Sequence, residues 1–423
     1  MQDVGTLSDV PVEKIGLMGE AMNAVETRFG HLKTRAADVT LLNALGERLA
    51  GMVEDGRPDE APGYMIVPAS AYLDPALFAA EKKAIFDKLP MLACLSSDIP
   101  NPGDYRRIQD LETPIIVTRT KKGEVKAFIN GCRHRGAALV YEDCGNARGG
   151  FVCPYHGWTY SDEGDLKGIA RPEAFEGLSK KDHGLVPVAC EERHGLVFIA
   201  PRADVPLDLD THLGEALGRE LALWRFDEVT GARSEPVELK GNWKLVYETF
   251  LETYHFTQAH KNNLVNYYFS NVNTVDRFGP HQRISLAHRT ITEHFAANGP
   301  ETRQPQDHLL VAYILFPGIV LINSAQVLEV FRIFPKTVDT TVVQHSCYSR
   351  LAAEMNGDDG FFEAIWQSAH NIVMNEDFPY GVTTAQRALE SGSLKELIFG
   401  RNELALQNNH QVIQAALEAD RQG

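Results

Sequence analysis

The sequence of 423 residues is poor in cysteine, lacks a long hydrophobic run and is short of basic residues. Its six cysteines are too few for a disulfide scaffold. No run of 18 apolar residues lacks a charge, and residues 1–30 are too acidic and interrupted for a signal peptide, so we expect a cytoplasmic protein without a membrane segment. Lysine and arginine number 41 against 57 acidic residues, for a net charge of −16. This balance argues against nucleic-acid binding, which needs a basic face.

Two short segments each place a cysteine and a histidine just before a glycine. The first is Cys132-Arg133-His134-Arg135-Gly136 and the second is Cys153-Pro154-Tyr155-His156-Gly157-Trp158. Two thiolates and two neutral imidazoles can hold a Rieske [2Fe–2S] cluster, with both cysteines on one iron and both histidines on the other. A Cys₂His₂ zinc site is the alternative, but zinc fingers usually pair like residues along the chain. The other four cysteines are expected to be buried small hydrophobes: Cys94, Cys144, Cys190 and Cys347.

These two segments resemble the oxygenase (α) component of Rieske non-haem iron oxygenases of the ring-hydroxylating type. The resemblance runs from about Tyr64 to Gln386. It implies a [2Fe–2S] cluster on Cys132, His134, Cys153 and His156, a mononuclear Fe(II), and O₂ as co-substrate. It also implies a ferredoxin and/or flavin reductase as partner, with NAD(P)H used only by a separate reductase. The expected assembly is a homotrimer, possibly with β subunits.

The pattern of the chain predicts an α+β protein in three parts. Residues 1–62 form a helical extension and linker, with helix expected over Val10–Leu49; it can clasp a neighbouring subunit or be a solvated arm. Residues 63–203 form a small all-β Rieske domain with a lead-in helix at 75–88 and the cluster loops at hairpin tips. Residues 204–423 form a catalytic domain in which helices flank an antiparallel sheet.

A second metal is expected near His255 and His260, which follow a predicted helix over Trp243–His255. On a regular helix, five steps of about 100° leave the two side chains pointing about 140° apart. They can therefore share a metal only if the helix ends or bends between them. A carboxylate completes the facial triad of a non-haem Fe(II) oxygenase. The resemblance assigns this ligand to Asp377, in a segment expected to end a helix, with Glu376 as the alternative.

Glu252 is expected to orient His255, because it lies three residues earlier on the same predicted helix face. In the family an acidic residue here links a metal histidine to a cluster histidine of a neighbouring subunit, which implies His156 as its partner. The family usually has Asp at this place. Glu is associated with members that oxidise methylammonium groups.

The expected activity is hydroxylation or dihydroxylation of an aromatic or other largely apolar small substrate, as in aromatic hydrocarbon catabolism. The alternatives are a Rieske monooxygenase that performs N- or O-demethylation or C–N cleavage, and a plain Rieske electron carrier. Apolar and aromatic side chains are expected to line the substrate pocket: Phe250, Val265, Tyr268, Phe269, Leu309, Val311, Tyr313, Leu321, Asn323 and Phe334.

Overall fold

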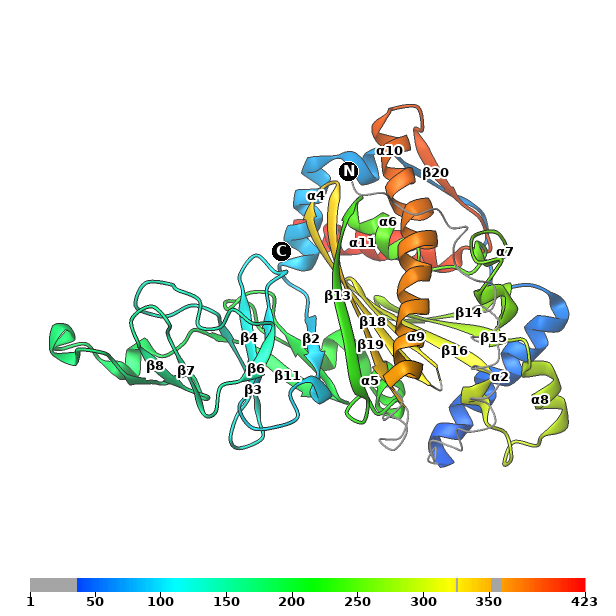
Figure 1. Cartoon of the computed structure of the whole chain (residues 1–423). Helices are drawn as coiled ribbons and strands as arrows, with labels where there is room; N and C mark the ends of the chain where they lie inside the picture. Colours follow the sequence, from blue (N-terminus) through cyan, green and yellow to red (C-terminus); the bar gives the residue numbers. More distant parts are fainter. Residues whose placement is uncertain (1–35, 325, 351–358, 423) are drawn as a thin grey trace.

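The structure, a computed structural model, describes residues 36–324, 326–350 and 359–422. Small β-sheets form one end of the molecule, and a large sheet covered by helices forms the rest (Figure 1). This arrangement confirms the expected α+β class. Residues 10–35 of the helix expected over Val10–Leu49 lie outside the described residues. The helix that follows is α2 (Ala36–Asp55), which extends beyond Leu49.

Antiparallel sheets of five and three strands carry the two cysteine–histidine segments. Strands β4 and β5 form a hairpin, and the turn at 161–165 joins β8 to β9. The second segment lies at the tip of the β7–β8 hairpin. The first is not a hairpin tip, because it joins β5 to β6, which are separated in the sheet by β4 and β3. The sheet orders are β10-β5-β4-β3-β6 and β7-β8-β9, with bounds β3 (Asp104–Ile108), β4 (Ile115–Arg119), β5 (Val125–Ile129), β6 (Cys144–Asn146), β7 (Gly150–Val152), β8 (Thr159–Ser161), β9 (Leu166–Gly168) and β10 (Pro187–Val188).

A third sheet, ordered β11-β12-β2, joins this end to the rest of the chain. Its central strand β12 (Leu196–Ile199) is fully buried, as the apolar run at 195–199 predicts. The flanking strands are β2 (Met91–Leu95) and β11 (Cys190–Arg193). Cys94 and Cys347 are buried as expected, Cys190 is partly buried, and Cys144 is exposed, so that expectation was wrong for Cys144.

A seven-stranded antiparallel sheet is the centre of the larger part. Side chains alternate between its two faces, so each strand contributes to two separate apolar clusters. The helices α2, α5 (Leu209–Leu223) and α8 (Ile291–Ala297) pack on one face. The strand order is β13-β19-β18-β17-β16-β15-β14, with bounds β13 (Thr230–Lys240), β14 (Tyr268–Phe278), β15 (His281–His288), β16 (Leu309–Leu315), β17 (Ile319–Asn323), β18 (Val327–Thr337) and β19 (Thr340–Ser349).

The opposite face of the large sheet is covered by four helical segments, one of which, the π-helical η7 (Val373–Thr384), carries the candidate metal ligand Asp377. The others are α6 (Trp243–Glu248), α9 (Asp359–Ile372) and α11 (Leu404–Gln422). In Figure 1 the orange helix α9 stands beside the green strand β13, in front of the yellow strands of the large sheet. The predicted lead-in helix is present as α4 (Pro75–Glu81) and a π-helical turn, η1 (Lys82–Phe86).

Two helix predictions were wrong at their ends. The helix that begins at Trp243 ends at Glu248 rather than at His255. The helix of residues 359–372 does not end near Pro379 but continues as η7, with Pro379 inside it. Proline lacks an N–H and its ring clashes with the carbonyl four residues earlier, so the wider π turn accommodates it. In the described part of the chain, no helix is both long and apolar enough to span a membrane.

Candidate metal centres

The two cysteine–histidine loops share one backbone design. In each loop the cysteine carbonyl accepts a hydrogen bond from the glycine N–H four residues later: Gly136 to Cys132 at 2.8 Å and Gly157 to Cys153 at 3.0 Å. Both glycines adopt positive φ, +75° and +70°, which a residue with a side chain rarely adopts. The glycines therefore let each loop turn tightly enough to present its cysteine and histidine side chains together.

The four candidate cluster ligands come together across these loops. His134 Nδ1 and His156 Nδ1 lie 3.1 Å apart, and burial together with the neighbouring Cys153 raises the pKa of the Cys132 thiol. The structure nevertheless does not gather all four around one point. In the described residues 36–324, 326–350 and 359–422, one group of three His, Cys, Asp or Glu side chains has all its ligand atoms within 4.8 Å of one another. That group is His255, His260 and Asp377, not the cluster loops. A cysteine pair beside a histidine pair fits a two-iron cluster better than a single tetrahedral zinc ion.

Two aromatic side chains contact the candidate cluster ligands and help to fix their positions. The Trp158 indole stacks on the His134 imidazole, with centroids 5.1 Å apart and planes 8° from parallel. The Tyr160 hydroxyl lies 3.2 Å from Cys132 Sγ and accepts a hydrogen bond from the Arg133 N–H at 3.0 Å. A hydroxyl beside a ligand sulfur is one way in which a protein tunes an iron–sulfur cluster. Sequence reasoning missed Tyr160, although it lies within the second motif's strand.

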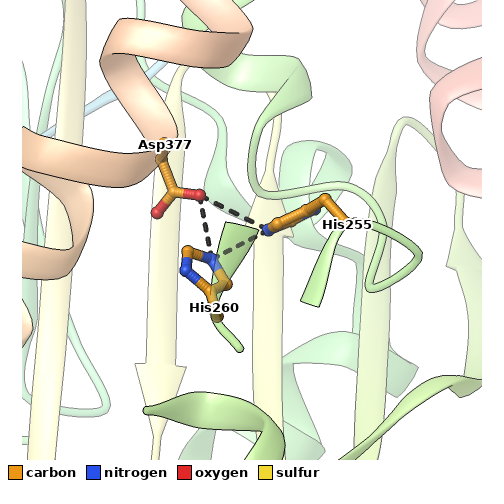
Figure 2. Close-up of side chains that lie close together, drawn as sticks. All are labelled: His255, His260 and Asp377. Carbon is orange, nitrogen blue, oxygen red and sulfur yellow. Dashed lines mark hydrogen bonds and ion pairs between the residues drawn. The ribbon is translucent and has the colours of Figure 1, made fainter. Parts of the chain in front are cut away.

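The second candidate centre combines residues at the two ends of a short helix with a residue from a helical segment far along the chain. Asn242 caps α6 by accepting the Lys244 N–H at 3.0 Å. After α6 ends, a one-turn helix, α7 (Phe256–Ala259), has His255 as its N-cap and His260 as its C-cap. The break that the five-residue spacing required is therefore present, and both imidazoles turn toward the same point. The third member, Asp377, comes from η7 on the other side of that point (Figure 2).

Three ligand-type atoms converge at this point. His255 Nε2 and His260 Nε2 lie 3.0 Å apart, and Asp377 Oδ1 lies 3.4 Å from the first and 3.1 Å from the second. Two imidazoles and one carboxylate directed at one position make the donor set of a facial triad, which leaves further positions of the metal open.

The remaining nitrogen of each imidazole is held by a carboxylate. His255 Nδ1 hydrogen-bonds to Glu252, which also accepts the His255 backbone N–H at 3.1 Å. His260 Nδ1 lies 2.6 Å from Glu376 Oε2, and Asn263 Nδ2 donates to the same carboxylate at 2.9 Å. A carboxylate at Nδ1 keeps the proton there and leaves the Nε2 lone pair free for a metal. Glu252 contacts His255 as predicted, but through the turn after α6 and not along a helix face.

Electrostatics favour a cation at the point where the Nε2 atoms meet. Burial lowers the pKa of the His255 imidazole, but its hydrogen bonds with Asp377 and Glu252 outweigh burial and raise that pKa to about 10. Burial raises the pKa of the Asp377 carboxyl, yet the two imidazoles hold it below its usual range. Three carboxylates therefore surround two imidazoles, and a divalent metal ion offsets this excess of negative charge.

The predicted pocket lining was partly wrong. Phe250, Tyr268 and Phe334 lie on the face of the large sheet that carries the triad. Strand residues alternate between faces, so several of the other candidates point away from the metal site. These are Phe269, Leu309, Val311, Tyr313 and Leu321, which pack in the opposite apolar cluster. On the triad face, the Phe250 ring packs against Phe331 at 4.5 Å and Phe378 at 6.4 Å between centroids.

The fold and the two candidate ligand sets are those of a class of protein that combines an iron–sulfur cluster domain with a mononuclear non-haem metal centre. Comparison with known families agrees. The Rieske [2Fe-2S] domain family matches residues 90–180, and the ring hydroxylating alpha subunit (catalytic domain) family matches residues 226–419. Together these matches cover more than half of the chain. The chain belongs to the α subunits of the Rieske, ring-hydroxylating oxygenases, a family whose cofactors are a [2Fe–2S] cluster and a mononuclear iron.

The relatives include both monooxygenases and dioxygenases. The chain is 35% identical over 246 residues to the glycine betaine monooxygenase oxygenase subunit of Chromohalobacter salexigens, covering 56% of this chain and 54% of that protein. It is 38% identical over 192 residues to the biphenyl 2,3-dioxygenase subunit alpha of Rhodococcus jostii, covering 44% of this chain and 41% of that protein. The matched stretches thus span about half the length of these curated relatives.

Solved structures show the same fold at low identity. The quaternary ammonium Rieske monooxygenase CntA with L-carnitine superposes with a TM-score of 0.69 at 21% identity, over 84% of this chain and 96% of that chain. Naphthalene 1,2-dioxygenase from Rhodococcus sp. bound to indole superposes with a TM-score of 0.65 at 20% identity, over 89% of this chain and 98% of that chain. Likeness at this identity establishes the fold alone.

Proposed function

We propose that the protein is the terminal oxygenase of a multicomponent system and hydroxylates or dihydroxylates an aromatic or other largely apolar substrate. The observation that carries this proposal is the triad of His255, His260 and Asp377, with the Nδ1 atoms of both imidazoles held by carboxylates. A plain electron carrier has no use for such a site. The open positions that a facial triad leaves are suited to O₂ chemistry at Fe(II).

Each group of residues has a distinct part in this proposal. Cys132, His134, Cys153 and His156 hold the cluster, whose histidine ligands raise its reduction potential and suit it to pass single electrons. His255, His260 and Asp377 hold the iron at which O₂ is activated. Glu252 and Glu376 keep the two imidazoles in the tautomer and orientation that metal binding requires. Phe250, Phe331 and Phe378 exclude water from the space beside the triad.

Electron transfer is proposed to run between two copies of the chain. Within one chain the β7–β8 hairpin, which carries Cys153 and His156, lies at the opposite end of the molecule from α7 (Figure 1). Each centre has an exposed tyrosine beside it: Tyr155 next to His156 is 57% exposed, and Tyr254 near Glu252 is 60% exposed. Burial of such aromatic surface favours contact between copies. We therefore place Glu252 at the junction with the His156 of a neighbouring copy in a homotrimer, with or without β subunits.

Two substrate classes remain in the proposal. The aromatic residues beside the triad suit an aromatic ring or another apolar skeleton. They also suit a methylammonium group, because aromatic faces attract quaternary cations. Glu252 in place of Asp, together with the glycine betaine monooxygenase relative, favours demethylation or C–N cleavage as the second candidate. A ferredoxin and/or flavin reductase is the proposed electron source, and the proposed location is the cytoplasm.

Iron analysis and oxygen uptake test the function. Purified protein is expected to carry about three irons per chain and to show the EPR signal of a mixed N,S-ligated cluster after reduction. A screen of aromatic and methylammonium compounds, with a generic ferredoxin and reductase, is expected to find substrate-dependent O₂ uptake. About two irons per chain and no such uptake would identify a plain carrier, and a colourless protein with stoichiometric zinc would exclude the cluster.

Mixed assemblies test the proposed route between copies. Cys132→Ala removes the cluster and His260→Ala removes the catalytic iron, so neither variant alone is expected to turn over. Assemblies that contain both variants are expected to recover part of the activity, because an intact cluster then faces an intact triad across a junction. No recovery would place the transfer within one chain.

A further inference from the structure

Four titratable side chains that the candidate metal centres do not use form a continuous line from the triad face of the sheet to the protein surface. Glu329 Oε2 lies 3.2 Å from His345 Nε2, and His345 Nδ1 lies 3.1 Å from His370 Nδ1. His370 Nε2 lies 3.6 Å from Glu235 Oε2. The Glu235 side chain is 58% exposed, whereas that of His345 is 1% exposed. The line therefore links solvent to a buried imidazole and to the Glu329 carboxylate beyond it, whose side chain is 17% exposed.

The fold fixes this order. Glu235 on β13 lies directly opposite His345 on β19, and Glu329 on β18 is the diagonal neighbour of His345 on the same face. His370, in the last turn of α9, covers them. Phe331 stacks on the His345 ring with centroids 4.1 Å apart, and Trp366 lies 4.8 Å from it. Both nitrogens of each imidazole thus face the next group in the line, which is the arrangement a proton relay needs.

The inner end of the line lies on the same face of the sheet as the aromatic residues beside the proposed oxygenase site. Glu329 is two residues from Phe331, whose ring packs against Phe250, and the Phe250 ring packs in turn against Phe378, the neighbour of Asp377. Burial and, after it, the charge of Glu329 raise the pKa of the Tyr268 hydroxyl, on the strand that follows the His260 loop. At its outer part, His370 precedes Asp377 by seven residues of one continuous helical run, roughly 10 Å along the axis.

Burying this carboxylate–imidazole cluster makes the fold less stable than apolar packing at the same positions would. A carboxylate and an imidazole in contact with Phe331, Trp366 and Cys347 lose hydration, and apolar side chains of similar size fill such positions at lower cost. The oxygenase reaction supplies a reason for it. When two electrons and O₂ convert R–H to R–OH and water, or a ring to a cis-diol, two protons are consumed in each turnover. The His260 and Asp377 side chains are 1% and 12% exposed, so protons that reach the buried side of the site need a path.

We propose that Glu235, His370, His345 and Glu329 form a relay that delivers protons from solvent to the oxygen-reducing site. The inference rests on the proposed oxygenase function. The proton enters at Glu235, moves through the two imidazoles and leaves from the Glu329 carboxyl toward the oxygen atoms that end as hydroxyl or water. The electrons come separately, through the cluster from the ferredoxin or reductase. The titratable groups that face the relay are Tyr268, Cys347 and the relay members themselves.

The test compares two oxidants in the iron-loaded protein, with a substrate found by the O₂-uptake screen. Turnover with O₂ and reductase needs two protons from solvent, whereas H₂O₂ brings the same two electrons and two protons with the oxygen. Glu329→Gln and His370→Ala are expected to lower the O₂-driven rate about 10²-fold, a typical loss of general acid catalysis, and to leave the H₂O₂-driven rate within about twofold of wild type. Imidazole added to His370→Ala is expected to restore O₂-driven turnover. The matched control is Glu363→Gln, which removes a carboxylate that lies on α9 outside the relay.

The protonation site of His345 can be measured by NMR as a second test, which needs neither iron nor turnover. In metal-free protein labelled with ¹⁵N-histidine, the relay predicts that neutral His345 carries its proton on Nε2, toward Glu329, and that Glu329→Gln changes this signal. Equal losses with both oxidants, or a rise in KM with unchanged kcat, would make these residues structural or substrate-binding and overturn the relay. An unchanged O₂-driven rate in both variants would do the same. Wild-type protein without O₂ uptake for any substrate would instead refute the proposed function.

Discussion

Replacement of Glu252 by Gln separates the role of this side chain in metal binding from its role in electron transfer. Both carboxylate oxygens of Glu252 accept from His255, one from the Nδ1–H and one from the backbone N–H at 3.1 Å. Gln has a single acceptor oxygen, so one of these N–H groups faces an NH₂ donor. The other keeps a neutral hydrogen bond in place of a charge-assisted one.

The expected loss of metal affinity in Glu252→Gln follows from these two contacts. One unsatisfied donor costs about 1–3 kcal/mol, and the loss of charge assistance costs about 1 kcal/mol more. A change of this size at the partner of a metal-binding histidine lowers metal affinity by about 10- to 100-fold. Iron is therefore expected to be lost on dilution of Glu252→Gln and regained in excess Fe(II), with the cluster spectrum unchanged.

The control for this experiment is Glu376→Gln. Glu376 has the same relation to the other imidazole: it binds His260 Nδ1 at 2.6 Å and accepts from Asn263 at 2.9 Å. The iron affinity of the Glu376→Gln variant is expected to fall by a similar factor. Glu376 has no proposed place at the junction between copies, so at full iron loading its electron transfer is expected to match that of wild type.

Single-turnover stopped-flow absorbance measures the difference. The pre-reduced, fully iron-loaded protein is mixed with O₂ and substrate, and oxidation of the cluster is followed. Cluster oxidation is expected to be slow in Glu252→Gln and normal in Glu376→Gln. If the two variants oxidise their clusters at the same rate, Glu252 has no bridging role and acts only through His255.

Three further predictions concern the metal centres and the fold. Asp377→Ala is expected to lose the mononuclear iron and all turnover while the cluster EPR signal persists; retention of that iron would show that Asp377 is not a ligand. His134→Cys is expected to lower the reduction potential of the cluster, because an anionic ligand replaces a neutral one, and an unchanged potential in a redox titration would exclude His134 as a ligand. Glu81→Ala is expected to cost about 3–5 kcal/mol in denaturant unfolding, because it leaves buried Lys244, now 2.6 Å from both Glu81 oxygens, without a counter-charge; a loss below about 1 kcal/mol would contradict this.

The sequence by itself determined much of the cluster domain. Its candidate ligands lie on two short loops, and the hairpin at 113–129 is a local structure whose turn and strand signals lie within a few residues. The spacing of His255 and His260 required a break in the helix, and the break is present. The exact end of that helix was not predictable, because α6 is buried on all sides and tertiary contacts decide its length.

Only the tertiary structure decided which carboxylate faces which histidine. Asp377 and Glu376 are adjacent in sequence, but successive residues of the π-helical segment point in different directions, so one faces the two Nε2 atoms and the other faces Nδ1 of His260. The side of the sheet on which each strand residue lies, and hence the pocket lining, also depended on register. The line from Glu235 to Glu329 joins the β18–β19 hairpin to β13 and α9, which lie elsewhere in the chain, so only the tertiary structure brings its members together.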